Sequence, residues 1–199
     1  VLIISSATHA TVAGENFYYP KMQILWFIAG FIAMLAVITI DYHTIAQWSN
    51  IIYILNICAN GLVIVIGTGQ ESTGAQRWIS IGPFSLQPSE FAKLALIVTL
   101  SKYLEKIKSL ENLKDILPVF LHVAIPTFVV AKQPDLGTAL VLIAIMLGIV
   151  FIAGISLKLL GGLIGAGVFS IPILWHLLKP YQKNRILIFL NPYLDPLGD

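Results

Sequence analysis

Long apolar segments alternate with short polar ones along this chain, and the alternation predicts a series of membrane-spanning helices. The apolar segments cover residues 22–40, 45–67, 91–104, 116–131, 139–153 and 159–178. Residues 1–8 have the composition of the end of a further apolar helix. A helix needs about 20 apolar residues to cross the hydrocarbon core of a bilayer. The pattern therefore predicts an all-α fold, a polytopic transmembrane helical bundle with about seven helices in this chain.

The composition supports a membrane protein over a soluble helical one. Hydrophobic residues make up 57% of the chain and charged residues only 11%. Soluble domains carry about 25% charged residues. The single cysteine, Cys58, excludes a disulfide framework within the chain, and a net charge of +2 is too small to indicate a nucleic-acid partner.

The polar segments between the helices are expected to be loops. They comprise residues 9–20, 41–43, 102–115, 132–138 and 179–199. Two prolines, Pro118 and Pro126, are expected to break the fifth apolar segment. Asn56 and Asn60 lie four residues apart on one helical face, so we expect them to bond a neighbouring helix.

Residues 74–93 differ from an ordinary connection between membrane helices, because they carry ionisable side chains and two prolines at a helix end. Pro88 suits the first position of a helix, where its missing N–H has no partner to lose. A helix that starts there places Glu90 and Lys93 three residues apart on one face.

Lysine and arginine counts leave the orientation open. The most basic loop holds Lys102, Lys106, Lys108 and Lys114, and we place it in the cytoplasm because cations favour that side. The opposite side then holds at least as many cations, namely Lys21, Arg77, Lys132, Lys179, Lys183 and Arg185. We interpret these outer cations as binding an anionic ligand. The alternative is that their number is incidental and serves no ligand.

In this orientation three polar segments meet on the outer face and supply the candidate site. The candidate side chains are Arg77, Trp78, Gln87, Glu90, Lys93, Lys132, Asp135, Lys183 and Arg185. Arginine binds phosphate with two parallel hydrogen bonds and lysine acts as a point charge. Glu90 and Asp135 are the candidate catalytic carboxylates, because a carboxylate in a cleft of low dielectric can act as a general base.

Each candidate also has a structural interpretation. Arg77 and Trp78 could anchor the chain at the membrane interface, Glu90 and Lys93 could neutralise one another, and Asp135 could cap a helix. Ser85, Ser89 and Thr138 lack a histidine at a recognisable spacing, so a catalytic triad is not supported. The histidines show no metal-ligand spacing, so no motif encodes a divalent cation such as Mg²⁺ or Mn²⁺, and the cofactor stays open.

Four motifs occur in order along the chain: GAQRWI at 74–79, QPSEFAK at 87–93, QPDLGT at 133–138 and NPYLDPLG at 191–198. Together they resemble the SEDS family (shape, elongation, division and sporulation), and most of all its RodA branch. The glutamine before Pro134 and the DPLG run favour RodA over FtsW.

The resemblance implies a ten-helix glycosyltransferase in the bacterial cytoplasmic membrane, with its active face outward. It would polymerise lipid II, a donor linked to undecaprenyl diphosphate, into glycan strands during cell-wall elongation. Its expected partner is a class B penicillin-binding protein. By the same resemblance, Arg77, Glu90, Lys93 and Asp135 match functional positions, whereas the family's main catalytic aspartate follows the seventh helix, beyond residue 199.

Residues 1–199 are therefore expected to be a single partial domain, truncated at both ends and inactive alone. Two other functions remain open. A lipid II flippase would use the same cations and interrupted helices, although no inverted repeat is evident. A non-catalytic scaffold for the penicillin-binding protein would leave the outer cations and carboxylates unexplained.

Overall fold

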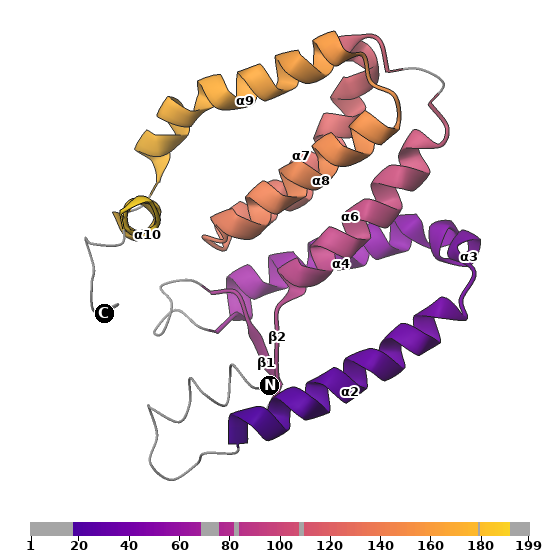
Figure 1. Cartoon of the computed structure of the whole chain (residues 1–199), viewed down its shortest axis with the longest axis vertical. Coiled ribbons are helices and arrows are strands. Elements are labelled where there is room, and N and C mark those ends of the chain that lie inside the picture. The colour runs from indigo at the N-terminus through magenta and orange to yellow at the C-terminus, as the bar shows by residue number, and fades with distance from the viewer. Residues whose placement is uncertain (1–17, 69–75, 82–83, 108–109, 179, 192–199) are drawn as a thin grey trace. The chain divides into compact units, whose positions relative to one another are not determined.

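The computed structural model describes residues 18–68, 76–81, 84–107, 110–178 and 180–191 (Figure 1). The chain divides into two compact units, Val1–Ile52 and Tyr53–Asp199, which we describe separately. The helix expected in residues 1–8 and most of the fourth motif, from residue 192 on, lie outside the described residues.

The first unit contains α2 (Tyr18–Ile38) and α3 (Tyr42–Gln47). The long apolar helix α2 confirms the prediction for residues 22–40. The short helix α3 shows that two other predictions were wrong. Residues 41–43 were expected to be a simple connection, and residues 45–67 were expected to form a single helix. Asp41 explains the early start of α3, since its carboxylate accepts a hydrogen bond of 2.9 Å from the backbone N–H of His43.

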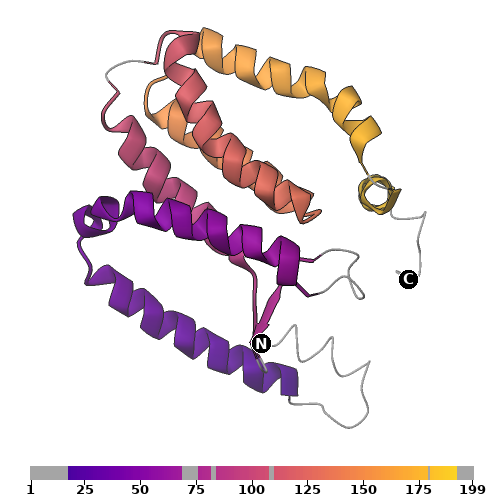
Figure 2. The ribbon, with the colours of Figure 1, turned by 180° about the vertical axis from the view of Figure 1, so that it is seen from behind.

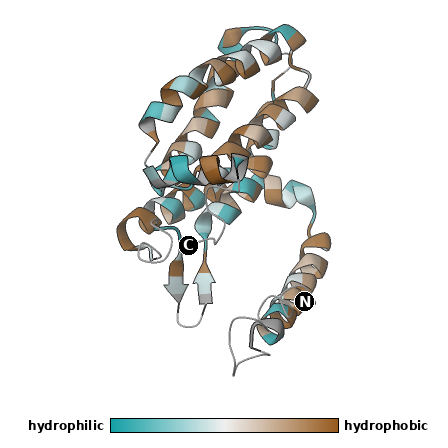
Figure 3. Cartoon of the chain, turned by 60° about the vertical axis from the view of Figure 1, so that its left-hand side comes forward, coloured by the Kyte–Doolittle hydropathy of each residue, from teal (hydrophilic) through white to brown (hydrophobic). Residues whose placement is uncertain are grey.

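The second unit holds most of the helices among the described residues and one small sheet. Its elements are α4 (Ser49–Ile66, which begins just before the unit), β1 (Ile79–Ile81), β2 (Phe84–Leu86), α6 (Pro88–Leu104), α7 (Leu113–Lys132), α8 (Leu136–Ile152), α9 (Leu157–Leu177) and α10 (Pro180–Leu190). Among the described residues, four helices (α2, α4, α7 and α9) are long and apolar enough to cross a membrane, and α8 is a shorter apolar helix. Hydrophobic residues predominate along the long helices (Figure 3), and many large apolar side chains are exposed, as expected of helices in contact with lipid.

The core of the second unit lies between α6, α7 and α8, which pack in pairs against one another (Figures 1 and 2). Its fully buried side chains include Leu96 and Leu100 of α6, Val119 of α7 and Leu142 of α8. The start of α6, the end of α7 and the start of α8 therefore meet at one end of the bundle. That end carries the second and third sequence motifs.

Two expectations about helix boundaries were wrong. Helix α7 continues through Pro118 and Pro126, although we expected a break there. Membrane helices tolerate proline because neighbouring groups can satisfy the freed carbonyls. Residues 180–190 form α10 rather than a loop, starting at Pro180, which suits the first position of a helix.

Within residues 74–93, β1 and β2 pair as a small antiparallel sheet, which the sequence did not reveal. Ile79 pairs with Leu86, Ser80 with Ser85 and Ile81 with Phe84. An isolated bridge between Thr68 and Trp78 joins the residue before β1 to the segment that follows α4. Strands of three residues are too short for an alternating pattern to stand out. The second part of this stretch confirms the predicted helix start at Pro88.

A polar contact joins α4, α6 and α7 inside the bundle. The hydroxyl of Tyr53 donates a hydrogen bond of 2.7 Å to the backbone carbonyl of His122, and their rings stack 4.2 Å apart. Nε2 of His122 lies 2.9 Å from Oγ1 of Thr99. Because polar groups in a membrane need partners, this contact fixes how the three helices pack.

Candidate functional site

Asp135 occupies the turn between α7 and α8 and is only 5% exposed. Its Oδ1 caps α8 by accepting a hydrogen bond of 3.4 Å from the backbone N–H of Thr138. Its Oδ2 accepts hydrogen bonds from Gln87 Nε2 at 3.1 Å and from Ser89 Oγ at 3.2 Å. Both carboxylate oxygens are thus occupied by donors from two parts of the chain, and the capping interpretation of Asp135 is confirmed.

Arg77 approaches the same turn from the segment just before β1. Its Nη2 donates a hydrogen bond of 2.6 Å to the carbonyl oxygen of Pro134, and its Nη1 lies 3.7 Å from Oδ1 of Asp135. The side chain is 17% exposed, and its buried Nε has no hydrogen-bond partner among the described residues. The guanidinium is therefore held from one side and keeps donors for a further group.

Gln133 extends these contacts to α4. Its Nε2 donates to the backbone oxygen of Asn60 at 2.8 Å, and Asn60 Nδ2 donates to the Pro88 carbonyl at 3.3 Å. This confirms that Asn60 bonds a neighbouring helix. We call the whole set the polar cluster: Asn60, Arg77, Gln87, Ser89, Gln133 and Asp135.

Glu90 and Lys93 form a separate ion pair one turn further along α6. Lys93 Nζ donates to Glu90 Oε2 at 2.8 Å, with 54% of the Glu90 side chain and 29% of the Lys93 side chain exposed. The neutralising pair considered from the sequence is therefore present. Unlike the carboxylate of Asp135, that of Glu90 is accessible to a substrate group, and a general base has to lie within hydrogen-bond reach of the proton that it takes.

The remaining candidates do not join the polar cluster through any contact that the described residues show. Lys132 Nζ lies 5.3 Å above the ring of Phe128, and Lys183 Nζ lies 6.0 Å from the ring of Trp175. Trp78 belongs to the bridge with Thr68. Arg185 lies in α10, and its side chain is outside the described part of the structure.

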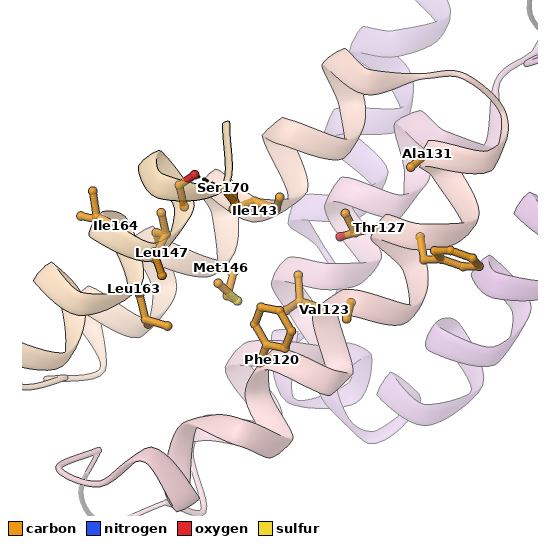
Figure 4. A pocket seen from close by; sticks show the side chains of 14 residues that line it. Phe120, Val123, Thr127, Ala131, Ile143, Met146, Leu147, Leu163, Ile164 and Ser170 are labelled. Atoms are coloured by element: carbon orange, nitrogen blue, oxygen red, sulfur yellow. Dashed lines mark hydrogen bonds between the residues drawn. The ribbon is translucent and has the colours of Figure 1, made fainter. Parts of the chain in front are cut away.

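Two cavities with mainly apolar linings lie between helices of the second unit. One, of about 670 Å³, lies between α7, α8 and α9 and is lined by residues such as Phe120, Met146 and Leu163 (Figure 4). The other, of about 520 Å³, has Lys132, Pro134 and Trp175 in its wall. The second cavity therefore reaches the turn that carries Asp135.

A family model described as "cell cycle protein", covering FtsW, RodA and SpoVE, matches residues 1–199. The chain belongs to the FtsW/RodA/SpoVE family. This is the SEDS family that the four motifs indicated.

Relatives in this family include stage V sporulation protein E of Bacillus subtilis, 36% identical over 92% of this chain and 50% of the relative. Peptidoglycan glycosyltransferase MrdB of Escherichia coli is 32% identical over 100% of this chain and 53% of the relative. A probable peptidoglycan glycosyltransferase FtsW of Wigglesworthia glossinidia brevipalpis is 35% identical over 100% of this chain and 52% of the relative. The chain thus spans about half the length of these relatives.

Two solved structures share the fold. One is a peptidoglycan synthase complex described as coordinating polymerization and crosslinking, with a TM-score of 0.74 and 29% identity over 98% of this chain and 57% of the other. The second is the rod shape determining protein RodA of Thermus thermophilus, with a TM-score of 0.62 and 27% identity over 73% of this chain and 46% of the other. The polytopic helical fold predicted from the sequence is confirmed.

In this member of the FtsW/RodA/SpoVE family, the polar cluster is suited to holding an arginine in place. Asp135 is surrounded by donors, and its Oδ1 lies 3.7 Å from Nη1 of Arg77, so the carboxylate orients these neighbours. Groups of three or more His, Cys, Asp or Glu that could hold a metal ion are absent from the described residues. The catalytic roles expected for Asp135 and Glu90 stay predictions.

Sequence reasoning gave no site role to Ser89, Gln133 or Asn60. One signal was available for Gln133, because it belongs to a Gln-Pro pair near a helix start, as Gln87 does: 87–88 at the start of α6 and 133–134 just before α8. The glutamine in each pair reaches across to another element, Gln87 to Asp135 and Gln133 to Asn60. Only the tertiary structure shows this.

Proposed function

We propose that the intact protein is a peptidoglycan glycosyltransferase that polymerises lipid II into glycan strands. One observation carries the proposal, namely that Arg77, Gln87 and Asp135, from three separate motifs, meet in a single polar cluster. Membership of the family, which includes relatives named peptidoglycan glycosyltransferases, supports this reaction.

The chemistry around the cluster suits an amphiphile with an anionic head. Arg77 has donors left for phosphate oxygens, and Lys132 stands in the wall of the adjoining cavity. The cavity between α7, α8 and α9 is almost wholly apolar and offers space for part of a hydrocarbon tail. A lipid-linked diphosphate combines these two properties, and it would enter sideways from the bilayer.

In the reaction that we propose, a carboxylate takes the proton from the acceptor sugar's hydroxyl. The hydroxyl oxygen attacks the anomeric carbon of the donor, the bond from that carbon to the phosphate oxygen breaks, and undecaprenyl diphosphate leaves. Arg77 and Lys93 would stabilise the negative charge that develops on the diphosphate. Glu90 would hold Lys93 in place, and Asp135 would hold Arg77.

We place the protein in the bacterial cytoplasmic membrane with the polar cluster on the outer side, beside a class B penicillin-binding protein. The resemblance to a synthase complex that couples polymerization and crosslinking supports such a partner. We favour the elongation branch and rod-shape maintenance because of the QPDLG and DPLG runs. The relatives include sporulation, elongation and division proteins at similar identity, so this assignment rests on the motifs alone.

The test supplies the intact protein and its crosslinking partner with lipid II and looks for glycan strands on a gel. Strands from the parent, with fewer from Glu90→Gln, would support the proposal. Absence of strands together with movement of lipid II across liposome membranes would replace it with a flippase. Absence of both, with the partner's crosslinking intact, would indicate a scaffold.

A further inference from the structure

Ser89 is fully buried, with 0% of its surface exposed, yet its hydroxyl lies within the polar cluster. It donates a hydrogen bond of 3.2 Å to Asp135 Oδ2, the oxygen that also accepts from Gln87 Nε2 at 3.1 Å. Gln87 Nε2 lies 3.0 Å from Ser89 Oγ as well, so the three groups form a closed triangle. The single proton of the hydroxyl is committed to the carboxylate, which leaves Ser89 no role as a nucleophile.

The triangle determines where the other carboxylate oxygen points. Because Oδ2 is held by two side-chain donors, the carboxyl group of Asp135 cannot rotate without breaking both bonds. Its Oδ1 therefore stays near Thr138 N, at 3.4 Å, and near Arg77 Nη1, at 3.7 Å. The carboxylate thus presents a fixed negative edge to the arginine.

Arg77 is fixed on this edge and on the Pro134 carbonyl, to which Nη2 donates at 2.6 Å. A guanidinium is planar, so two contacts on its Nη atoms set the plane and leave the direction of Nε–H defined. Nε is buried and has no partner among the described residues. A donor held in one direction before the ligand arrives loses less freedom when the ligand binds.

We propose that Ser89, together with Gln87, is a positioning residue that acts through Asp135 to aim the Arg77 guanidinium at a diphosphate group. The inference rests on the proposed function, because it requires Arg77 to bind the diphosphate of a lipid-linked substrate. Ser89 itself does not touch the substrate.

A double-mutant cycle on the intact protein with its crosslinking partner tests the relay. The four proteins are the parent, Ser89→Ala, Arg77→Lys and the double variant, and the readout is kcat/KM for lipid II. Arg77→Lys keeps the charge but loses the planar fork, so a measurable rate should remain. We expect Ser89→Ala to lower kcat/KM roughly tenfold, the scale of a hydrogen bond to a charged group. In the Arg77→Lys background, Ser89→Ala should lower kcat/KM by less than about twofold.

A control variant on the same helix separates this role from general damage to α6. Ser101 is exposed near the other end of α6, and Ser101→Ala should polymerise at the parent's rate. Thermal unfolding of every variant is recorded alongside. If Ser89→Ala does not fold, Gln87→Met takes its place in the cycle, since it removes the other side-chain donor to Asp135 Oδ2.

The outcomes distinguish the positioning role of Ser89 from the proposed function. Losses that multiply in the double variant, or a Ser89→Ala protein that matches the parent, would overturn the positioning role and leave the proposed function standing. If the parent does not polymerise lipid II, the proposed function fails. In that case the affinity of the same four proteins for undecaprenyl diphosphate, measured in nanodiscs, replaces kcat/KM as the readout of the cycle. A smaller affinity loss in the Arg77→Lys background would support the relay, and a parent without affinity would overturn it.

Discussion

The side-chain amide of Gln133 donates a hydrogen bond of 2.8 Å to the backbone carbonyl of Asn60, 73 residues earlier in the chain. Gln133 is 1% exposed and stands where α7 ends, while Asn60 lies in α4. The same amide also reaches Asn60 Oδ1 at 3.2 Å, whereas Gln133 Oε1 has no partner among the described residues. The contact therefore depends on the donor alone, and it ties α4 to the turn that carries Asp135.

This asymmetry predicts an order of stability for two variants of Gln133. Gln133→Leu removes the donor but also the unpaired oxygen, so we expect a loss of about 1 kcal/mol in the free energy of unfolding. Gln133→Glu removes the donor and buries an unpaired charge, so we expect about 3 kcal/mol or more. Thermal unfolding in detergent measures both, with Gln23→Leu on the exposed face of α2 as the control. A Glu variant as stable as the Leu variant would contradict this account of the contact.

Asp135 offers a test of capping against catalysis. Asp135→Ala removes the cap of α8 and leaves Arg77 without its carboxylate, which we expect to cost about 3–5 kcal/mol. Asp135→Asn keeps an oxygen for Thr138 N, so it should stay folded and polymerise lipid II at a reduced rate. Thermal unfolding and glycan-strand assays on both variants distinguish a capping role of Asp135 from a catalytic one. An Asn variant that folds like the parent but makes no strands would instead assign Asp135 the role of the base.

Helix α6 carries its own control for the Glu90–Lys93 pair. Lys102 and Glu105 form a second pair at the same spacing and the same 2.8 Å distance near the other end of the helix. Exposed pairs contribute little to stability, so Glu90→Gln and Glu105→Gln should each change the free energy of unfolding by less than about 0.5 kcal/mol. We expect only Glu90→Gln to lower polymerisation. Equal rates for the two variants would remove Glu90 from the reaction.

The apolar cavity between α7, α8 and α9 can be filled from α9. A side-chain carbon added at Gly167 meets nothing within 4 Å, so Gly167→Phe should project into the cavity without unfolding the helix. If the tail of a lipid-linked substrate occupies this space, KM for lipid II should rise about tenfold or more. Gly161→Phe on the same helix, outside the cavity lining, is the matched control. An unchanged KM in Gly167→Phe would exclude the tail from this cavity.

Asp41 predicts a small dependence of stability on acid. The backbone hydrogen bond from His43, and then the bond from its ring, hold the pKa of Asp41 below the ordinary value of 3.8. A lowered pKa contributes stability that is fully present above about 3.8 and is lost as the pH falls through the lowered value. Asp41→Asn should abolish this dependence. His43→Ala should retain most of it, because the backbone bond remains. Thermal unfolding of the parent and both variants at acidic pH measures the stability, and NMR titration of the Asp41 carboxyl carbon in the parent and His43→Ala measures the pKa.

The pattern of apolar and polar residues determined most of the helices, because a membrane helix must satisfy its own backbone and cover itself with apolar side chains. Pro88 marked the start of α6 and Asp135 the start of α8 for local reasons, a missing N–H and a capping carboxylate. The pairing of β1 with β2 and the helix at residues 180–190 escaped prediction, since none of these elements is long enough to leave a periodic signal.

The sequence by itself gathered Arg77, Gln87, Glu90 and Asp135 into one candidate site, from motifs and a common membrane side. The tertiary structure divided that set, placing three of them in the polar cluster and leaving Glu90 with Lys93 on the open face of α6. Which side chain faces which depends on how α6, α7 and α8 rotate about their axes when they pack. Buried leucines and valines on all three helices fix that rotation, and no single segment of the sequence records it.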